Sequence, residues 1–120
     1  MGLASYRGLD AWKKAMSLVE EVYRLTADFP PEEKFGLTSQ MRRASVSVPA
    51  NTAEGYGRIH RGDYVHHLSM SRGSLAELET LLTIAVRLKL TTRAAAVPCW
   101  KLAQDEGMIL NKLLASLKAV

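Results

Sequence analysis

Apolar residues recur every three or four positions along four separate stretches of this chain, and that spacing is the period of an α-helix. The stretches cover residues 10–27, 38–55, 63–88 and 93–117, and the connections between them are short. No strand pattern of comparable strength interrupts them. The sequence therefore predicts an all-α fold, an antiparallel up-down-up-down four-helix bundle, built as one domain over residues 1–120.

The first and third stretches each carry a regular apolar stripe. In the first stretch, one stripe consists of Trp12, Met16, Val19 and Tyr23. In the third, a heptad pattern runs from Tyr64 to Ala85 and is typical of helices packed side by side. Gly73 interrupts the third pattern. Because small residues dominate positions 44–53 of the second stretch, we expect Gly73 to be the point where these two helices approach most closely.

The second and fourth stretches each contain a proline, and each allows two structural interpretations. Pro49 removes one backbone hydrogen bond, so we expect a kink in a continuous helix rather than a division into two. The fourth stretch has two adjacent apolar stripes, which indicate either a subunit interface or a broad core. One stripe contains Ala103, Leu110, Leu114 and Leu117, and the other contains Leu102, Ile109, Leu113 and Val120.

Charge is spread evenly along the sequence. The chain has 16 Lys and Arg residues against 12 Asp and Glu residues, and each quarter contains four basic residues. The sequence pI of about 9.4 permits contact with nucleic acid, but no polybasic tail is present.

No apolar run approaches the roughly 20 residues of a membrane-spanning helix, and the N-terminus lacks a signal-peptide core. A cytoplasmic location is expected.

Motifs that would indicate an enzyme are missing. The sequence contains no phosphate-binding loop, no GxSxG elbow, no HExxH and no CxxC pair. His66 and His67 are adjacent, so on a helix they point about 100° apart and do not share a metal. Cys99 is expected to be a buried structural thiol. We expect no catalytic residue, no cofactor and no metal site.

The segment that joins the second and third helices carries the clearest binding chemistry. Arg58 and Arg61 supply guanidinium donors and Tyr56 supplies an aromatic face, which together suit the contact of an RNA backbone. Arg42 and Arg43 form a second basic pair. The same residues also suit an ordinary loop in which the arginines pair with Glu54 or Asp63, and the sequence leaves both interpretations open.

Three blocks of the sequence carry a family resemblance. They are residues 6–16, YRGLDAWKKAM, residues 35–55, FGLTSQMRRASVSVPANTAEG, and residues 72–80, RGSLAELET. With them, the chain resembles the bacterial four-helix-bundle family named for proteins encoded in intervening sequences of 23S ribosomal RNA genes. One departure follows the third helix, where Lys89-Leu90 replaces the Gly-Tyr pair that is common in the family. We therefore expect the corner between the third and fourth helices to differ.

The resemblance implies a homopentamer of four-helix bundles without enzymatic activity. It also implies a relation to accessory proteins of diversity-generating retroelements, which are similar pentamers that bind nucleic acid through a basic surface. The sequence thus favours a nonenzymatic oligomeric binding module that contacts RNA or a ribonucleoprotein. The alternative is a protein-interaction or structural scaffold without a nucleic-acid role.

Overall fold

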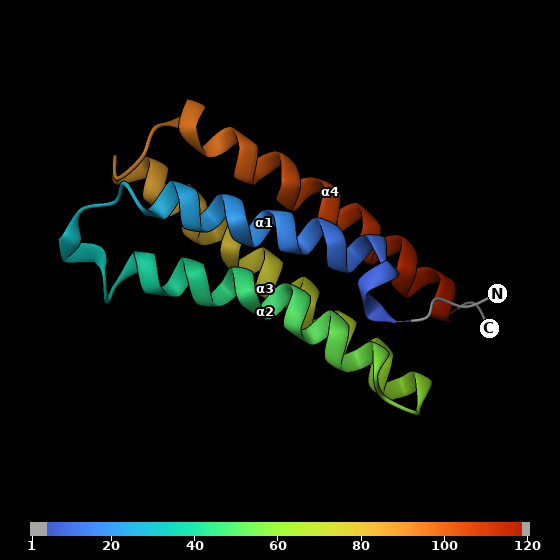
Figure 1. Cartoon of the computed structure of the whole chain (residues 1–120). Helices are drawn as coiled ribbons and strands as arrows, with labels where there is room; N and C mark the ends of the chain where they lie inside the picture. The colour runs from blue at the N-terminus through green and yellow to red at the C-terminus, as the bar shows by residue number, and fades with distance from the viewer. Residues whose placement is uncertain (1–4, 119–120) are drawn as a thin grey trace.

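The computed structural model describes residues 5–118, which form four antiparallel α-helices (Figure 1). Helix α1 covers Asp10–Thr26, α2 covers Leu37–Tyr56, α3 covers Arg61–Arg87 and α4 covers Arg93–Lys118. Each helix packs against its neighbours in the sequence, and α1 also packs against α4, so the order around the bundle is α1, α2, α3, α4. The predicted up-down-up-down bundle is confirmed, with dimensions of 46 × 23 × 20 Å.

Two short 3-10 helices were not anticipated from the sequence. η1 covers Tyr6–Gly8 before α1, and η2 covers Pro31–Glu33 in the α1–α2 connection. The carboxylate of Glu33 accepts a hydrogen bond from the backbone N–H of Leu37 at 3.1 Å. It thereby satisfies one of the free amides at the start of α2.

The buried face of α1 is shifted along the sequence by one position from the predicted stripe. The buried positions are Ala11, Ala15, Leu18, Val22 and Thr26, whereas Met16 and Tyr23 are about 40% exposed, at 39% and 42%. Two alanines on the buried face allow α1 to lie close to its neighbours. The larger side chains of the predicted stripe consequently stand beside the contact rather than within it.

Small polar side chains join α2 to α3. The hydroxyls of Ser47 and Ser74 are 2.8 Å apart, and Ser71 donates to the carbonyl of Val48 at 2.9 Å. Helix α2 continues through Pro49, which confirms that the proline does not divide it. These short side chains let the two helices approach closely while their buried hydroxyls remain hydrogen-bonded.

The close approach lies at Gly55, and the prediction that placed it at Gly73 was wrong. A Cβ on Gly55 would stand 2.6 Å from the Cβ of His67, which is closer than real atoms come. Apart from the nearby backbone of α3 itself, a Cβ on Gly73 would meet no atom of residues 5–118 within 4 Å. Gly73 is exposed because it lies on the side of α3 that faces away from the bundle, although it adjoins Ser74 in the sequence.

Helix α4 begins at a threonine cap. The Thr92 hydroxyl accepts a hydrogen bond from the N–H of Ala95 at 3.1 Å. Ala103, Leu110 and Leu114 are buried, and the second stripe, Leu102, Ile109 and Leu113, is half-buried against the same core. Val120 lies outside the described residues. In the described part of α4, the second stripe therefore widens the core of the single chain.

The corner between α3 and α4 contains a lysine in the left-handed backbone region. Lys89 has φ of 60°, a value that glycine adopts without strain and other residues rarely adopt. The N–H of Leu90 bonds to the carbonyl of Ala85 at 2.9 Å, and the N–H of Lys89 bonds to Val86 at 3.0 Å. Helix α3 therefore ends with the hydrogen-bond pattern that usually has glycine in the left-handed position, and lysine occupies that position here.

None of the helices within residues 5–118 has both the length and the apolar character needed to span a membrane.

Candidate nucleic-acid interface

The fold separates the five candidate residues into two groups at opposite ends of the bundle. Tyr56 ends α2, Arg58 lies in the α2–α3 connection, and Arg61 begins α3. Arg42 and Arg43 lie in the second turn of α2, toward the other end. The structure therefore brings Tyr56, Arg58 and Arg61 together and leaves the other two arginines apart from them.

The net charge of the chain lies entirely in one half of the bundle. Division of the four helices at their midpoints gives a connection half, which contains the α2–α3 connection, and a far half. The connection half has eight basic against four acidic residues, and the far half has eight of each. The basic residues of the connection half are Arg7, Lys13, Lys14, Arg58, Arg61, Arg72, Lys112 and Lys118, and its acidic residues are Asp10, Glu54, Asp63 and Glu106.

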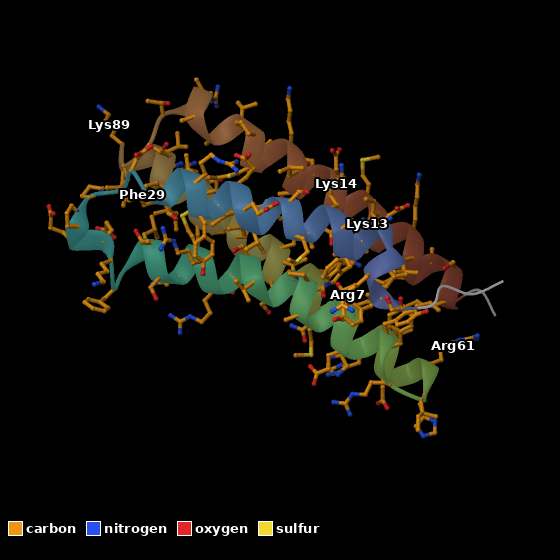
Figure 2. The ribbon with its side chains drawn as sticks, viewed as in Figure 1. Arg7, Lys13, Lys14, Phe29, Arg61 and Lys89 are labelled. Carbon is orange, nitrogen blue, oxygen red and sulfur yellow. The ribbon has the colours of Figure 1, made fainter. Side chains whose placement is uncertain are left out.

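Figure 2 shows this polarity among its labelled residues. Arg7, Lys13, Lys14 and Arg61 lie in the connection half, while Lys89 lies at the opposite end. Residues far apart in the sequence meet in this half because the first residues of α1 and the last residues of α4 lie at the same end (Figure 1). Sequence reasoning missed Arg7, Lys13, Lys14, Lys112 and Lys118 as part of one basic region. The antiparallel order of the helices was the signal that could have found them.

Arg58 and Arg61 are both exposed, but their surroundings differ. The guanidinium of Arg58 pairs with the carboxylate of Glu54 at 3.2 Å, one helical turn earlier. The side chain of Arg61 has no hydrogen-bond or ion-pair partner within residues 5–118. Half of each side chain in the Arg58–Glu54 pair remains exposed, so solvent weakens their attraction. Both guanidinium groups are accessible to a ligand.

Tyr56 rests against a second tyrosine at the base of this region. The rings of Tyr56 and Tyr64 are 5.9 Å apart at an interplanar angle of 84°, so they meet edge to face. Burial, with a smaller contribution from Tyr56, raises the pKa of Tyr64. Tyr56 is half-buried, and its ring packs against the ring of Tyr64.

His67 connects this region to α2 through a polar group that sequence reasoning did not identify. Its Nδ1 lies 3.3 Å from the side-chain oxygen of Asn51 and 3.6 Å from the carboxylate of Glu54. Glu54 therefore contacts both His67 and Arg58. The spacing of Asn51 and Glu54 by three residues on one helix face was the available signal.

Arg42 makes contacts within the chain. Its guanidinium lies over the ring of Tyr23, 4.4 Å from the centroid, and its Nε donates to the hydroxyl of Thr26 at 2.9 Å. Arg43 is exposed and donates to the Ser39 hydroxyl at 3.3 Å. It lines a groove between α2 and α3 together with Glu77. Arg42 thus joins α1 to α2, whereas Arg43 remains accessible.

No group of three or more potential metal-ligating side chains occurs in the part of the chain that the structure describes. Cys99 is buried, and desolvation raises the pKa of its thiol to about 11, so little thiolate forms at neutral pH. Glu106 is fully buried, and burial raises the pKa of its carboxyl to about 8. Neither carboxyl oxygen of Glu106 has a hydrogen-bond partner among residues 5–118.

Comparison with known proteins agrees with this architecture. The profile of the family described as 23S rRNA-intervening sequence protein matches residues 7–112. A crystal structure of a protein of unknown function from the S23 ribosomal protein family, from Bacteroides thetaiotaomicron, is similar with a TM-score of 0.78 and 18% identity. The similarity covers 87% of this chain and 97% of that one, and it supports the fold. No curated protein sequence matches the chain. The match over residues 7–112 places this four-helix chain in the 23S rRNA-intervening sequence protein family.

Proposed function

We propose that this protein is a nonenzymatic, cytoplasmic binding module that assembles as a homopentamer and contacts RNA or a ribonucleoprotein through its connection half. The observation that carries the proposal is the spatial separation of charge. Eight basic residues against four acidic ones give the connection half all of the net charge, although no segment of the sequence is strongly basic. A ring of copies would repeat this basic end and strengthen binding through multiple contacts.

Arg61 and Arg58 are the residues best placed to contact phosphates. Arg61 is exposed and lacks a partner within residues 5–118, so no internal ion pair has to break when it binds an anion. Arg58 would exchange an exposed pair with Glu54 for a phosphate. Planar guanidinium groups suit phosphate because they donate two parallel hydrogen bonds. Arg42 contributes to stability in this proposal rather than to binding.

The test is RNA affinity measured at several salt concentrations on the intact assembly. Each neutralised phosphate on single-stranded RNA contributes about −0.7 to the slope of log affinity against log salt. We expect Arg58→Ala with Arg61→Ala to weaken binding to unrelated RNA sequences alike, to reduce that slope, and to leave the oligomer mass unchanged. The matched control is Lys34→Ala with Lys101→Ala, which removes two exposed charges from the far half.

The alternative function, a protein scaffold without a nucleic-acid role, is favoured by the internal contacts of Arg42 and Arg58. Under this alternative, RNA affinity would be weak and equal in both double variants. Loss of Arg58 and Arg61 would change only the melting temperature or the assembly. That result would contradict the RNA proposal.

A further inference from the structure

The carboxylate of Glu54 on α2 has a nitrogen partner on each of its two oxygens. Its Oε1 lies 3.2 Å from Nη2 of Arg58, and its Oε2 lies 3.6 Å from Nδ1 of His67 on α3. The Arg58 and Glu54 side chains are half exposed, whereas only 12% of the His67 side chain is exposed. One negative charge therefore lies between a permanent cation and a side chain that becomes a cation only when it is protonated.

Asn51 determines which nitrogen of the His67 ring carries the proton. The side-chain NH2 of Asn51 donates to the carbonyl and hydroxyl oxygens of Ser47, both at 2.9 Å. Because a carbonyl oxygen only accepts, the NH2 group has to face Ser47, and the side-chain oxygen of Asn51 faces His67, 3.3 Å from Nδ1. An oxygen acceptor requires an N–H opposite it. Neutral His67 therefore carries its proton on Nδ1, and Nε2 is the nitrogen that takes up a second proton.

The charge of His67 changes how firmly Glu54 holds Arg58. When His67 is neutral, Arg58 is the cation that attracts the carboxylate. When His67 is protonated, the imidazolium attracts the same carboxylate and repels the guanidinium. Arg58 and His67 contact different oxygens, so their competition for Glu54 is electrostatic rather than steric.

Glu54 is the one charged side chain among residues 5–118 that forms an ion pair with His67. The ring of His66 lies 5.9 Å from that of His67 and meets it edge to face. Helices α2 and α4 both pack against α3. The other titratable or charged groups at this end of the three helices are Tyr56 of α2, Asp63 and Tyr64 of α3, and Lys112 and Lys118 of α4, and η1, which packs on α2, adds Arg7.

We propose that His67 regulates RNA binding through Glu54: protonated His67 attracts the carboxylate, releases Arg58 to an RNA phosphate and strengthens binding as pH falls. This inference rests on the proposed function and adds regulation by pH at the same site. His67 is a positioning residue, because it acts on Arg58 through Glu54 without touching RNA. When Arg58 leaves Glu54 for a phosphate, the carboxylate is left to His67. The bound state therefore favours protonated His67, and by reciprocity protonation favours binding.

The test is the affinity of the intact assembly for one single-stranded RNA at constant ionic strength, from about pH 8 to about pH 5.5, a range that spans the ordinary titration of histidine. We expect wild-type affinity to rise by about two- to fivefold per site as pH falls, which is the value of an exposed ion pair. His67→Gln should abolish this rise, because glutamine does not ionise. His60→Gln is the matched control, since His60 is exposed in the same connection, and it should retain the rise.

Two further variants distinguish action through Glu54 from direct contact of His67 with RNA. In an Arg58→Ala background, His67→Gln should no longer alter the pH profile, because the guanidinium that His67 controls is absent. Glu54→Gln should bind RNA more tightly than wild type at high pH and show a smaller rise as pH falls. A rise that still depends on His67 in the Arg58→Ala background would indicate direct contact and overturn the inference.

The tautomer of His67 is tested without RNA. Nitrogen-15 NMR of the folded protein at high pH should show the proton of neutral His67 on Nδ1. A proton on Nε2 would overturn the inference and leave the proposed RNA contact standing, as would RNA binding whose pH profile is the same in wild type and His67→Gln. Failure of the wild type to bind RNA at any pH would overturn the proposed function itself, and this inference with it.

Discussion

The guanidinium of Arg42 on α2 lies over the ring of Tyr23 on α1, and the distance from the Arg42 Cζ to the ring centroid is 4.4 Å. Its Nε also donates to the Thr26 hydroxyl at 2.9 Å, so a single side chain holds the end of α1 against the start of α2. The Thr26 hydroxyl in turn donates to the carbonyl of Val22 at 2.8 Å. A lysine in place of Arg42 would keep the charge but lose the planar stacking and the fixed donor geometry.

Arg42→Ala should therefore reduce the free energy of unfolding by about 1–3 kcal/mol, because it removes a cation–π contact and a half-buried hydrogen bond. Urea denaturation at an unchanged m value measures the loss. Arg43→Ala is the matched control, since the Arg43 side chain is exposed and its one hydrogen bond within residues 5–118 goes to the Ser39 hydroxyl. Equal stability of the two variants would show that the contact with Tyr23 adds nothing.

Gly55→Ala should destabilise the bundle by about 1–3 kcal/mol despite the better helix propensity of alanine. The new methyl group would stand 2.6 Å from the Cβ of His67, and relief requires separation of α2 from α3. Gly73→Ala provides the contrast, because no described atom outside the nearby α3 backbone lies within 4 Å of its Cβ position. We expect Gly73→Ala to stabilise the helix by up to about 1 kcal/mol. Thermal melts of both variants should shift in opposite directions.

Lys89→Gly should stabilise the corner between α3 and α4 by roughly 1 kcal/mol. The gain comes from relief of the left-handed backbone at φ of 60°, reduced by the greater freedom of glycine in the unfolded chain. Lys89→Ala controls for loss of the lysine side chain, because alanine retains the Cβ responsible for the strain. A melting temperature that rises equally in both variants would contradict this explanation.

Glu106 should make stability depend on pH. Its carboxyl is fully buried and finds no hydrogen-bond partner in the described part of the chain. Desolvation raises its pKa from 4.5 to about 8, an effect that Lys14 partly offsets. A raised folded-state pKa leaves stability intact below pH 4.5. As pH rises toward 8, the unfolded chain releases the proton and the folded chain retains it, so stability falls by up to about 1.4 kcal/mol per pH unit.

Glu106→Gln isolates this effect, because glutamine has nearly the same shape and does not ionise. The advantage of the variant over the wild type in free energy of unfolding should grow between pH 4.5 and pH 8 and level off above it. Asp105→Asn serves as the control, since Asp105 is exposed and lies 3.9 Å from Lys14. A constant difference between Glu106→Gln and wild type across this range would show that Glu106 does not titrate as described.

The helices themselves could be predicted from local patterns, but the rotation of each helix about its own axis, which decides the face that it buries, could not. The stop at Gly57 after α2, the threonine cap of α4 and the continuity of α2 through Pro49 follow from residues adjacent in the sequence. The buried face of α1 could not be predicted, because two neighbouring faces are both apolar. Alanine at positions 11 and 15 decides between them only once α1 lies against the other helices.

The sequence by itself determined the helical period, the number of helices and the family, since each depends on residue type and spacing along the chain. The tertiary structure decided where the charge lies. Every quarter of the sequence holds four basic residues, yet the folded bundle has all of its net charge in the connection half. The reason is that antiparallel packing brings the start of α1, the end of α2, the start of α3 and the end of α4 together, so an even linear distribution becomes polar in space.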